Sequence, residues 1–359
     1  MKYSLKLGKP FGIKISIHWT FLLLIAWIVI IDVRQGLNMQ QILLSIIFIL
    51  TLFLCVTLHE LGHALTAKRY GSEVHSITLL PIGGMANIKD MPEKPGQELV
   101  VSAAGLIVNV VIAGIIWLFL AIGGRPDLQQ MNFQAITAEN FFIMLMFVNL
   151  FVVVFNLIPA FPMDGGRLLR AALSFKMDRL KATRYAKNAG QVFAVAFIIA
   201  GMFINPFLVI IGFFVFLGAR AEYEMIKFRQ GLNDFKVNDA LITDYTTLER
   251  TDSLGKAADL LVHRNESGFI VVSDGDFEGM LTKEGIIDGL SKYGKDGKVE
   301  DFMNTALPSL DINRPLHEVF QEMQQNKYAV LPVLSNDKIK GILDRESIHE
   351  LMLVQNAVH

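Results

Sequence analysis

The sequence has little cysteine and little charge. A single Cys among 359 residues excludes a disulfide framework and a zinc module built from cysteines, so any metal must be held by His and carboxylates. Charged residues make up only 19% of the chain and hydrophobic residues 52%, with a mean hydropathy of +0.43, against about 25% and about 45–50% in soluble domains. This composition excludes disorder, coiled coil and collagen, and it is too apolar for one soluble globule.

The net charge of −1 conceals two unlike halves. Residues 1–222 contain 18 Lys and Arg against 11 Asp and Glu, whereas residues 223–359 contain 15 against 23. The basic half consists of long apolar runs, and a helix needs about 20 mostly apolar residues to cross a bilayer. We expect six spans, at residues 16–31, 41–66, 98–120, 140–158, 190–204 and 207–220. The last two meet at Asn205-Pro206, a turn signal, which favours a tight hairpin over one long helix.

The basic residues also predict an orientation, because Lys and Arg favour cytoplasmic loops. If the N-terminus lies inside, 16 of the 18 Lys and Arg fall on the cytoplasmic side, and only Arg34 and Arg125 fall outside. The first run is followed by Asp32 instead of the small residues of a cleavage site, which predicts a retained anchor. We therefore expect a multi-pass protein of the plasma membrane with a cytoplasmic C-terminal half. His18, beside Trp19, is expected to be an interfacial anchor.

The C-terminal half contains an internal repeat. Residues 269–273 and 278–281 are typical of two strands joined by a turn, and residues 329–334 and 339–343 repeat this order about 60 residues later. A helical stretch precedes each copy, at 254–262 and 316–325. The repeat indicates two modules that stack on each other, and it resembles a tandem CBS domain pair over residues 235–354.

His59-Glu60-Leu61-Gly62-His63 stands near the cytoplasmic end of the second run. Positions i and i+4 share a helix face, so two imidazoles can hold one zinc ion while Glu60 points toward a bound water. A five-residue pattern also arises by chance, and a histidine is often only structural. Ionisable groups inside an apolar run are costly to bury, however, and usually mark a functional site. We therefore predict a zinc site with His59 and His63 as ligands.

A catalytic zinc ion normally has a third protein ligand, and Asp164 is the candidate. It is the only carboxylate between Glu139 and Asp178, and it follows the fourth run on the same side as His63. The surrounding Pro and Gly residues interrupt the helix, which is tolerated at membrane depth where the backbone lines a cavity. The alternative is a solvated Asp at an ordinary helix end. The presence of the 59–63 motif in the same sequence favours the interpretation of Asp164 as a metal ligand.

Together these motifs resemble the site-2 protease family of intramembrane metalloproteases, family M50. They are H-E-x-x-H at 59–63, N-x-x-P at 156–159 followed by D-G-G at 164–166, and L-L-P-x-G-G at 79–84. The resemblance covers nearly the whole chain and fits the subgroup with C-terminal CBS domains. It implies one catalytic Zn²⁺ held by His59, His63 and Asp164, with Glu60 as the general base. The family's A-G-P motif reads A-G-L at 104–106, a departure that affects local backbone shape and not the ligands.

The implied peptide hydrolysis needs donors for a tetrahedral oxyanion as well as a base. Asn156 is the first candidate donor and Asn109 the second. The alternative for both is an interhelical hydrogen bond, as polar residues commonly make in membrane bundles. That alternative is favoured for Asn109, and the catalytic role is favoured for Asn156.

Residues 74–88 are apolar and β-prone but contain Pro81 and Gly83-Gly84. A helical transmembrane substrate must unwind before water can attack its backbone. We hypothesise that this segment forms membrane-associated strands whose edge binds the unwound substrate by β-addition. The alternative is an ordinary cytoplasmic hairpin.

The CBS pair resembles adenosyl-nucleotide sensors in which an Asp follows G-h-h-[ST]-x-x. Gly285 and Ser347 occupy the two Asp positions, so an adenine nucleotide would lack its ribose contact at both sites, although Thr282 could bind a phosphate. A structural role, or a homodimer formed through the CBS domains, is an equal alternative. The acidic charge of this half argues against nucleic acid as a partner.

The predicted architecture is a polytopic α-helical membrane protein with about six transmembrane helices, a short membrane-associated β segment and an α+β cytoplasmic tandem CBS domain. The expected domains are 1–222 (metalloprotease), 223–234 (linker), 235–295 and 296–359 (CBS repeats). The predicted function is an intramembrane zinc endopeptidase that cuts a membrane-anchored regulator. The competing hypotheses are a CBS-regulated channel or transporter with a His/Glu/Asp metal site, and a catalytically silent binding module. A transporter does not require a Glu between two His at i and i+4.

Overall fold

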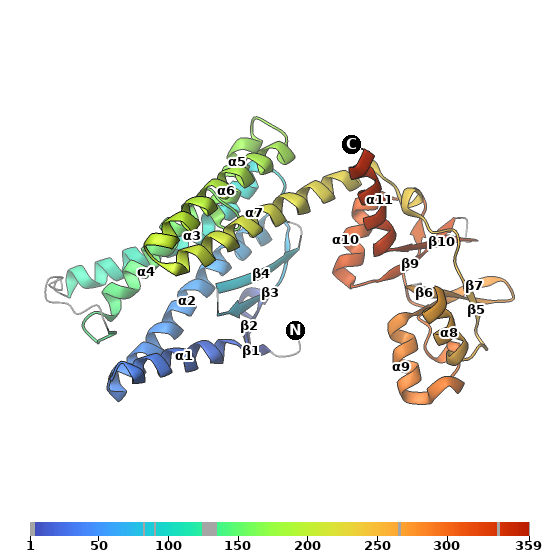
Figure 1. Cartoon of the computed structure of the whole chain (residues 1–359), viewed down its shortest axis with the longest axis horizontal. Helices are drawn as coiled ribbons and strands as arrows, with labels where there is room; N and C mark the ends of the chain where they lie inside the picture. Colours follow the sequence, from blue (N-terminus) through green and yellow to red (C-terminus); the bar gives the residue numbers. More distant parts are fainter. Residues whose placement is uncertain are drawn as a thin grey trace. The chain divides into compact units, whose positions relative to one another are not determined.

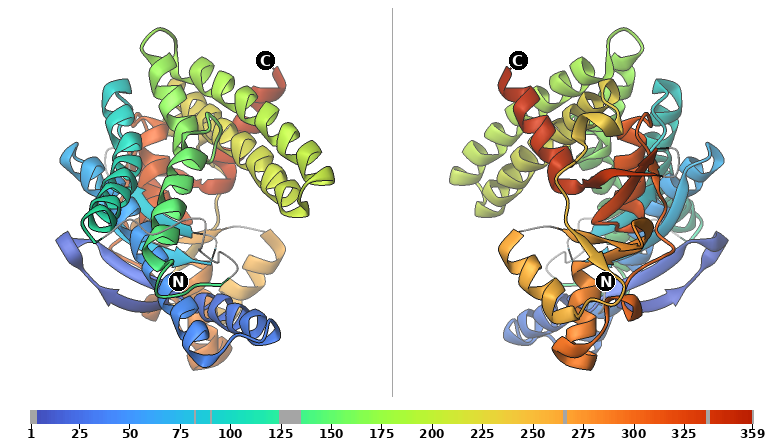
Figure 2. Two further views of the ribbon diagram at one scale, coloured as in Figure 1. Left: turned by 90° about the vertical axis from the view of Figure 1, so that its left-hand side faces the viewer. Right: turned by 90° about the vertical axis from the view of Figure 1, so that its right-hand side faces the viewer.

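The computed structural model describes residues 4–81, 83–89, 91–123, 135–264, 267–335 and 338–358. The chain forms two compact units, Met1–Glu224 and Met225–His359 (Figure 1), and Figure 2 gives two further views. The predicted outside residue Arg125 lies outside the described residues. Helix α7 runs without interruption from Pro206 to Gly231, so the first residues of the expected linker are helical.

The first unit contains seven helices within the described residues. They are α1 (Phe21–Arg34), α2 (Met39–Arg69), α3 (Pro95–Ile122), α4 (Phe141–Leu157), α5 (Asp164–Ser174), α6 (Arg179–Phe203) and α7 (Pro206–Gly231). α2 begins at a capping box, in which Asn38 and Gln41 each accept the other's backbone N–H. α6 and α7 are separate helices joined at Asn205, whose side chain accepts from the Phe207 N–H at 3.0 Å. The hairpin expected at Asn205-Pro206 is therefore present.

Four of these helices, α2, α3, α6 and α7, are long and apolar enough to cross a membrane, judged over the described ranges. α4 is a shorter apolar helix of 17 residues, and α1 has 14 residues. The prediction that the first run is helical from residue 16 is wrong, because Lys14–His18 form strand β2 and α1 begins at Phe21. Ile15 and Ile17 alternate with polar neighbours, and this period of two with β-branched residues favours a strand.

A four-stranded sheet packs beside α2 in the first unit. Its strands are β1 (Ser4–Gly8), β2 (Lys14–His18), β3 (Glu73–Leu80) and β4 (Gly83–Lys89), in the order β1-β2-β3-β4. β2 and β3 are parallel, and the two other pairs are antiparallel. The hypothesis of strands within residues 74–88 is therefore correct, and β4 lies at one edge of the sheet (Figure 1).

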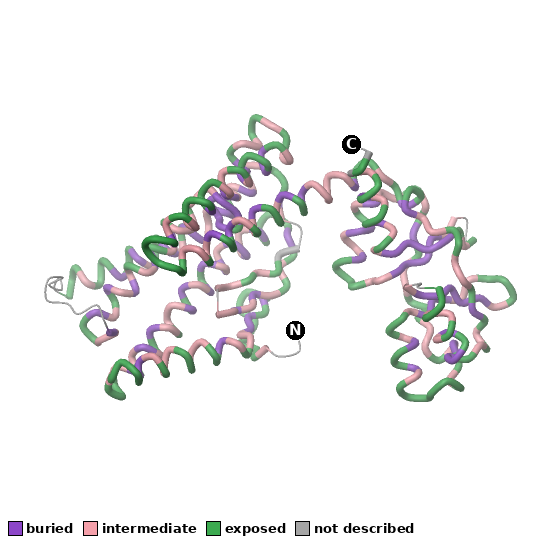
Figure 3. The backbone as a smooth tube through the Cα atoms, in the orientation of Figure 1, coloured by how far each residue is buried: buried purple, intermediate pink, exposed green. Residues whose placement is uncertain are grey.

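In the first unit, many large apolar side chains lie on the surface and several polar side chains lie in the interior, the reverse of the usual arrangement in a soluble protein. Large apolar side chains such as Ile115, Phe119 and Phe203 are more than half exposed, whereas His59, Asn109 and Arg170 are buried. Figure 3 shows exposed residues interspersed along α6 and α7 and a continuous exposed stretch where the two helices meet. An apolar surface of this extent is stable only in contact with lipid or protein. The first unit is therefore a multi-pass membrane domain.

The second unit consists of two copies of one α+β module. The first contains β5 (Thr247–Glu249), α8 (Leu254–Arg264), β6 (Gly268–Ser273), β7 (Asp276–Thr282) and α9 (Lys283–Tyr293); the second contains β8 (Leu310–Asp311), α10 (Leu316–Asn326), β9 (Val330–Ser335), β10 (Lys338–Asp344) and α11 (Arg345–Val358). In each copy a parallel pair is followed by an antiparallel pair. Ile270 and Met280 of the first copy pack with Val330 and Ile342 of the second, as stacked repeats should.

Candidate active site

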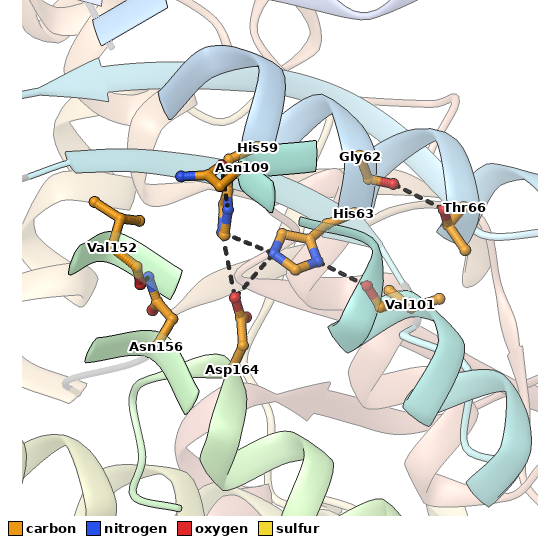
Figure 4. Close-up of polar contacts among 9 residues, drawn as sticks. All are labelled: His59, Gly62, His63, Thr66, Val101, Asn109, Val152, Asn156 and Asp164. Atoms are coloured by element: carbon orange, nitrogen blue, oxygen red, sulfur yellow. Dashed lines mark hydrogen bonds and ion pairs between the residues drawn. The ribbon is translucent and has the colours of Figure 1, made fainter. Parts of the chain in front are cut away.

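Three buried side chains converge beside α2 (Figure 4). His59 and His63 come from α2, and Asp164 is the first residue of α5. The Asp164 Oδ2 atom lies 3.2 Å from His59 Nε2 and 3.1 Å from His63 Nε2, and the two Nε2 atoms are 3.1 Å apart. The fold thus brings together the three residues predicted as metal ligands, although His63 and Asp164 are 101 residues apart along the chain.

The opposite nitrogen of each imidazole is held by α3. His63 Nδ1 lies 2.7 Å from the carbonyl oxygen of Val101, and His59 Nδ1 lies 3.1 Å from Oδ1 of Asn109. A carbonyl oxygen only accepts, so Nδ1 of His63 carries the hydrogen and its Nε2 presents a lone pair toward Asp164. An amide oxygen has the same effect on His59. This arrangement is typical of metal-binding histidines, whose second nitrogen donates to an outer acceptor.

The three ligand atoms fit a zinc ion. Ligands about 2.0–2.1 Å from a tetrahedral zinc ion lie about 3.3 Å from one another, and the observed separations are 3.1, 3.1 and 3.2 Å. Two imidazole nitrogens and a carboxylate oxygen at this distance need a proton or a metal cation between them, because their lone pairs would otherwise repel one another. Hard oxygen and imidazole nitrogen are also donors that suit Zn²⁺. The residues present therefore have the geometry and the chemistry of a three-ligand zinc site.

Two glycines make room for this cluster. A Cβ built at Gly105 of α3 would lie 2.6 Å from His63 Cε1 and 2.8 Å from His59 Cε1, and a Cβ at Gly84 of β4 would lie 2.5 Å from Glu60 Cγ. All three distances are too short for real carbon atoms, so α3 and β4 can approach the motif only because these residues lack side chains. Glu60 is half-buried and packs against the edge strand at Gly84.

The loop before α5 determines where Asp164 lies. Cβ atoms at Gly165 or Gly166 would collide with the backbone of residues 157–161, including the Leu157 carbonyl oxygen at 2.5 Å and the Ala160 carbonyl carbon at 2.6 Å. The first turn of α5 is therefore held directly against the end of α4. Asp164 is the residue at the start of this turn, which explains why Gly-Gly must follow it.

The predicted oxyanion donors occupy different positions. Asn109 is buried and contacts His59, an interhelical hydrogen bond between α2 and α3. Nδ2 of Asn156 donates to the Val152 carbonyl of its own helix at 3.0 Å. An amide nitrogen carries two hydrogens, and this bond uses one of them. His18, predicted as an anchor, contacts Thr20 Oγ1 at 2.8 Å and does not belong to the metal group found among the described residues.

Sequence reasoning missed the contributions of Val101, Gly105 and Gly84. Val101 acts through its backbone carbonyl, which no side-chain pattern reveals. Gly105 had a signal, because it is the glycine of the A-G-P-like motif at 104–106. Only the packing of α2 against α3 shows that its missing side chain provides space for the imidazoles.

Comparison with known proteins gives an independent result. The profile of peptidase family M50 matches residues 47–135 and 119–201, and that of the CBS domain matches residues 237–292 and 299–353. A zinc metalloprotease of Methanocaldococcus jannaschii is 31% identical over 99% of this chain and 97% of its own length. A CBS domain-containing protein of Bacillus subtilis is 30% identical over 30% of this chain and 78% of its own length. Among solved structures, a site-2 protease from Methanocaldococcus jannaschii is 36% identical over 62% of this chain and 95% of that one, with a TM-score of 0.45.

The fold, the site and these relatives define an intramembrane zinc metalloprotease with a CBS domain pair. More specifically, the chain belongs to peptidase family M50. This assignment confirms the predicted enzyme and its zinc cofactor, and it disfavours the channel or transporter.

Proposed function

We propose that His59, His63 and Asp164 are the zinc ligands of this protease and that Glu60 is its general base. The observation that carries the ligand assignment is the near-tetrahedral spacing of their three ligand atoms, at 3.1 to 3.2 Å. Glu60 adjoins His59 on α2 and packs against β4, the strand expected to bind substrate.

The protein's own groups then have distinct tasks. Zinc, when bound, polarises the scissile carbonyl and makes water acidic enough to be a nucleophile near neutral pH. Glu60 accepts a proton from the attacking water and delivers it to the leaving amine. Val101 and Asn109 hold the imidazoles in the tautomer with hydrogen on Nδ1, which directs both Nε2 lone pairs toward the metal position. The second amide hydrogen of Asn156 stabilises the oxyanion.

The substrate binds as a strand added to β4. β4 is at the edge of its sheet, and an edge strand offers unpaired backbone groups to an extended peptide. Gly84 is part of β4 and directly faces Glu60, so a peptide paired along this strand would pass the base. A segment of a membrane-anchored regulator that unwinds near the end of its helix is the substrate class that fits.

The membrane domain crosses the plasma membrane six times, with α1, α2, α3, α4, α6 and α7 as spans. Its N-terminus and the CBS pair lie in the cytoplasm, in accordance with the basic residues on that side. α1 and α4 are short for a span, at 14 and 17 residues, and exposed apolar side chains such as Trp27 and Phe151 suit them to a lipid environment. The domains divide at 222, 234 and 295, and the CBS pair regulates or dimerises the protease.

The test of this function uses the full chain in detergent or nanodiscs with a single-span substrate. Glu60→Gln keeps the side-chain size and removes the base, so cleavage should fall at least about 100-fold while bound zinc stays at one ion. Asp164→Asn should instead lose zinc affinity, and a chelator should abolish wild-type cleavage until zinc is restored. Equal cleavage by Glu60→Gln and wild type would exclude Glu60 as the base.

A further inference from the structure

A second group of charged residues, two of them buried, lies outside the metal site. Arg170 of α5, 2% exposed, donates from Nε to Glu98 Oε1 of α3 at 2.7 Å and from Nη1 to Glu222 Oε1 of α7 at 2.6 Å. Glu98 is 1% exposed, and its second oxygen is 3.6 Å from Nη2 of Arg179. The guanidinium of Arg170 also lies 5.0 Å from the centre of the Phe161 ring. We call Glu98, Arg170, Arg179 and Glu222 the charge cluster.

The charge cluster joins the two halves of the metal site. α3 carries Glu98 and, one turn later, Val101, whose carbonyl oxygen orients His63. α5 carries both Asp164 and Arg170, separated by less than two turns of one short helix. The Glu98–Arg170 pair is therefore a direct link between the helix that orients the imidazoles and the helix that supplies the carboxylate.

Burial indicates that this link is specific. Two charged groups removed from water are costly unless their geometry is good, and breaking such a pair leaves an uncompensated charge. A helix of 11 residues needs no buried ion pair to pack, whereas a carboxylate that must lie about 2.0–2.2 Å from a metal ion needs a fixed helix. Phe161 and the glycines at 165 and 166 secure the start of α5, and Arg170 secures its second turn.

We propose that Arg170 is a positioning residue for the metal ligand Asp164, acting through α5, and that Glu222 makes α7 part of the same constraint. The proposal rests on the ligand set given under the proposed function. It assigns Arg170 no contact with substrate or metal. α7 contributes Glu222 to the first unit. Further along the same helix, Phe228 packs near Phe320 and His349 of the second unit.

The experiment measures zinc affinity of the purified full chain by competition with a chromogenic chelator, and the visible absorption of the cobalt-substituted protein. Arg170→Gln should weaken zinc binding about 10-fold and alter the cobalt spectrum, at the low end of the effect of groups that contact a ligand directly, because Arg170 acts on Asp164 only through α5. Arg170→Lys, which keeps a cation, should recover part of the affinity. Arg184→Gln is the matched control: Arg184 bonds Tyr223 Oη of α7 at 3.2 Å from α6, so this variant removes a guanidinium from an α7 contact without touching α5.

Wild-type zinc affinity and an unchanged cobalt spectrum in Arg170→Gln would overturn the proposal. If that variant does not fold, Glu222→Gln decides: a weakening of at least about twofold with the same spectral change supports the proposal, and wild-type values overturn it. Equal weakening by Arg184→Gln would show a general packing effect and also overturn it. Asp164→Asn distinguishes a failure of this proposal from a failure of the ligand set on which it rests, because unchanged zinc affinity in that variant refutes the ligand set itself.

Discussion

Replacement of Gly105 by alanine should separate the stability of α3 from metal binding. In an ordinary helix position, Gly→Ala gains up to about 1 kcal/mol. The new Cβ would collide with His63 Nε2 and would lie 2.6 Å from His63 Cε1 and 2.8 Å from His59 Cε1, so the imidazoles or α3 must move by about 1 Å. A displacement of about 1 Å in a catalytic site costs about 100-fold in rate, which corresponds to about 2.7 kcal/mol. We therefore expect cleavage to fall about 100-fold and zinc affinity to fall with it, while the helix itself is not weakened.

Gly114→Ala is the matched control in the same helix. No described atom lies within 4 Å of a Cβ built at Gly114, so this variant should keep wild-type zinc affinity. The assays are chelator competition for zinc, cleavage of a single-span substrate, and thermal unfolding in the same detergent. If Gly105→Ala bound zinc as tightly as Gly114→Ala, the close packing of α3 on the imidazoles would not be a constraint on the site.

Two further predictions concern the asparagines and the edge strand. Asn109→Leu removes the acceptor of the His59 N–H and should weaken zinc binding about 10- to 100-fold. Asn156→Leu should leave zinc affinity unchanged and lower kcat about 100- to 1,000-fold. Kinetics and chelator competition on both variants test these roles, and effects that were exchanged between the two variants, or absent, would contradict them. Gly83→Val with Gly84→Val should abolish cleavage of a transmembrane substrate, since a side chain at Gly84 collides with Glu60. Unimpaired cleavage would exclude β4 as the substrate strand.

The metal group was predictable because its signal is local. His59 and His63 are one helical turn apart, and the only carboxylate on the fourth run's Pro- and Gly-rich end is Asp164. The close approaches at Gly84 and Gly105 were not predictable, since they depend on how α2 packs against β4 and α3. Glu98 was counted as the first residue of a span, and nothing in its neighbourhood indicates a partner 72 residues later.

The fold was predictable to the extent that hydropathy and periodicity agreed. The Asn205-Pro206 hairpin and the repeated strand pairs of the second unit carried clear turn signals, such as Asp274-Gly275, where both residues adopt positive φ. β2 was mistaken for part of a helix because Ile15 and Ile17 raise the hydropathy of a window whatever its period. Its pairing with β3, some 60 residues away, is a long-range contact that no local pattern contains.

The distance from His59 to the end of α2 determines how far a substrate must reach along this helix to be cut. His59 lies ten residues from the Arg69 end of this helix, which corresponds to about 15 Å of axial rise. An extended peptide covers the same depth with only about four or five residues. A substrate that remained helical would need about twice that number to reach the proposed metal ligands. The position of the scissile bond, counted from the membrane surface, should therefore report how many substrate residues are unwound when they are cut.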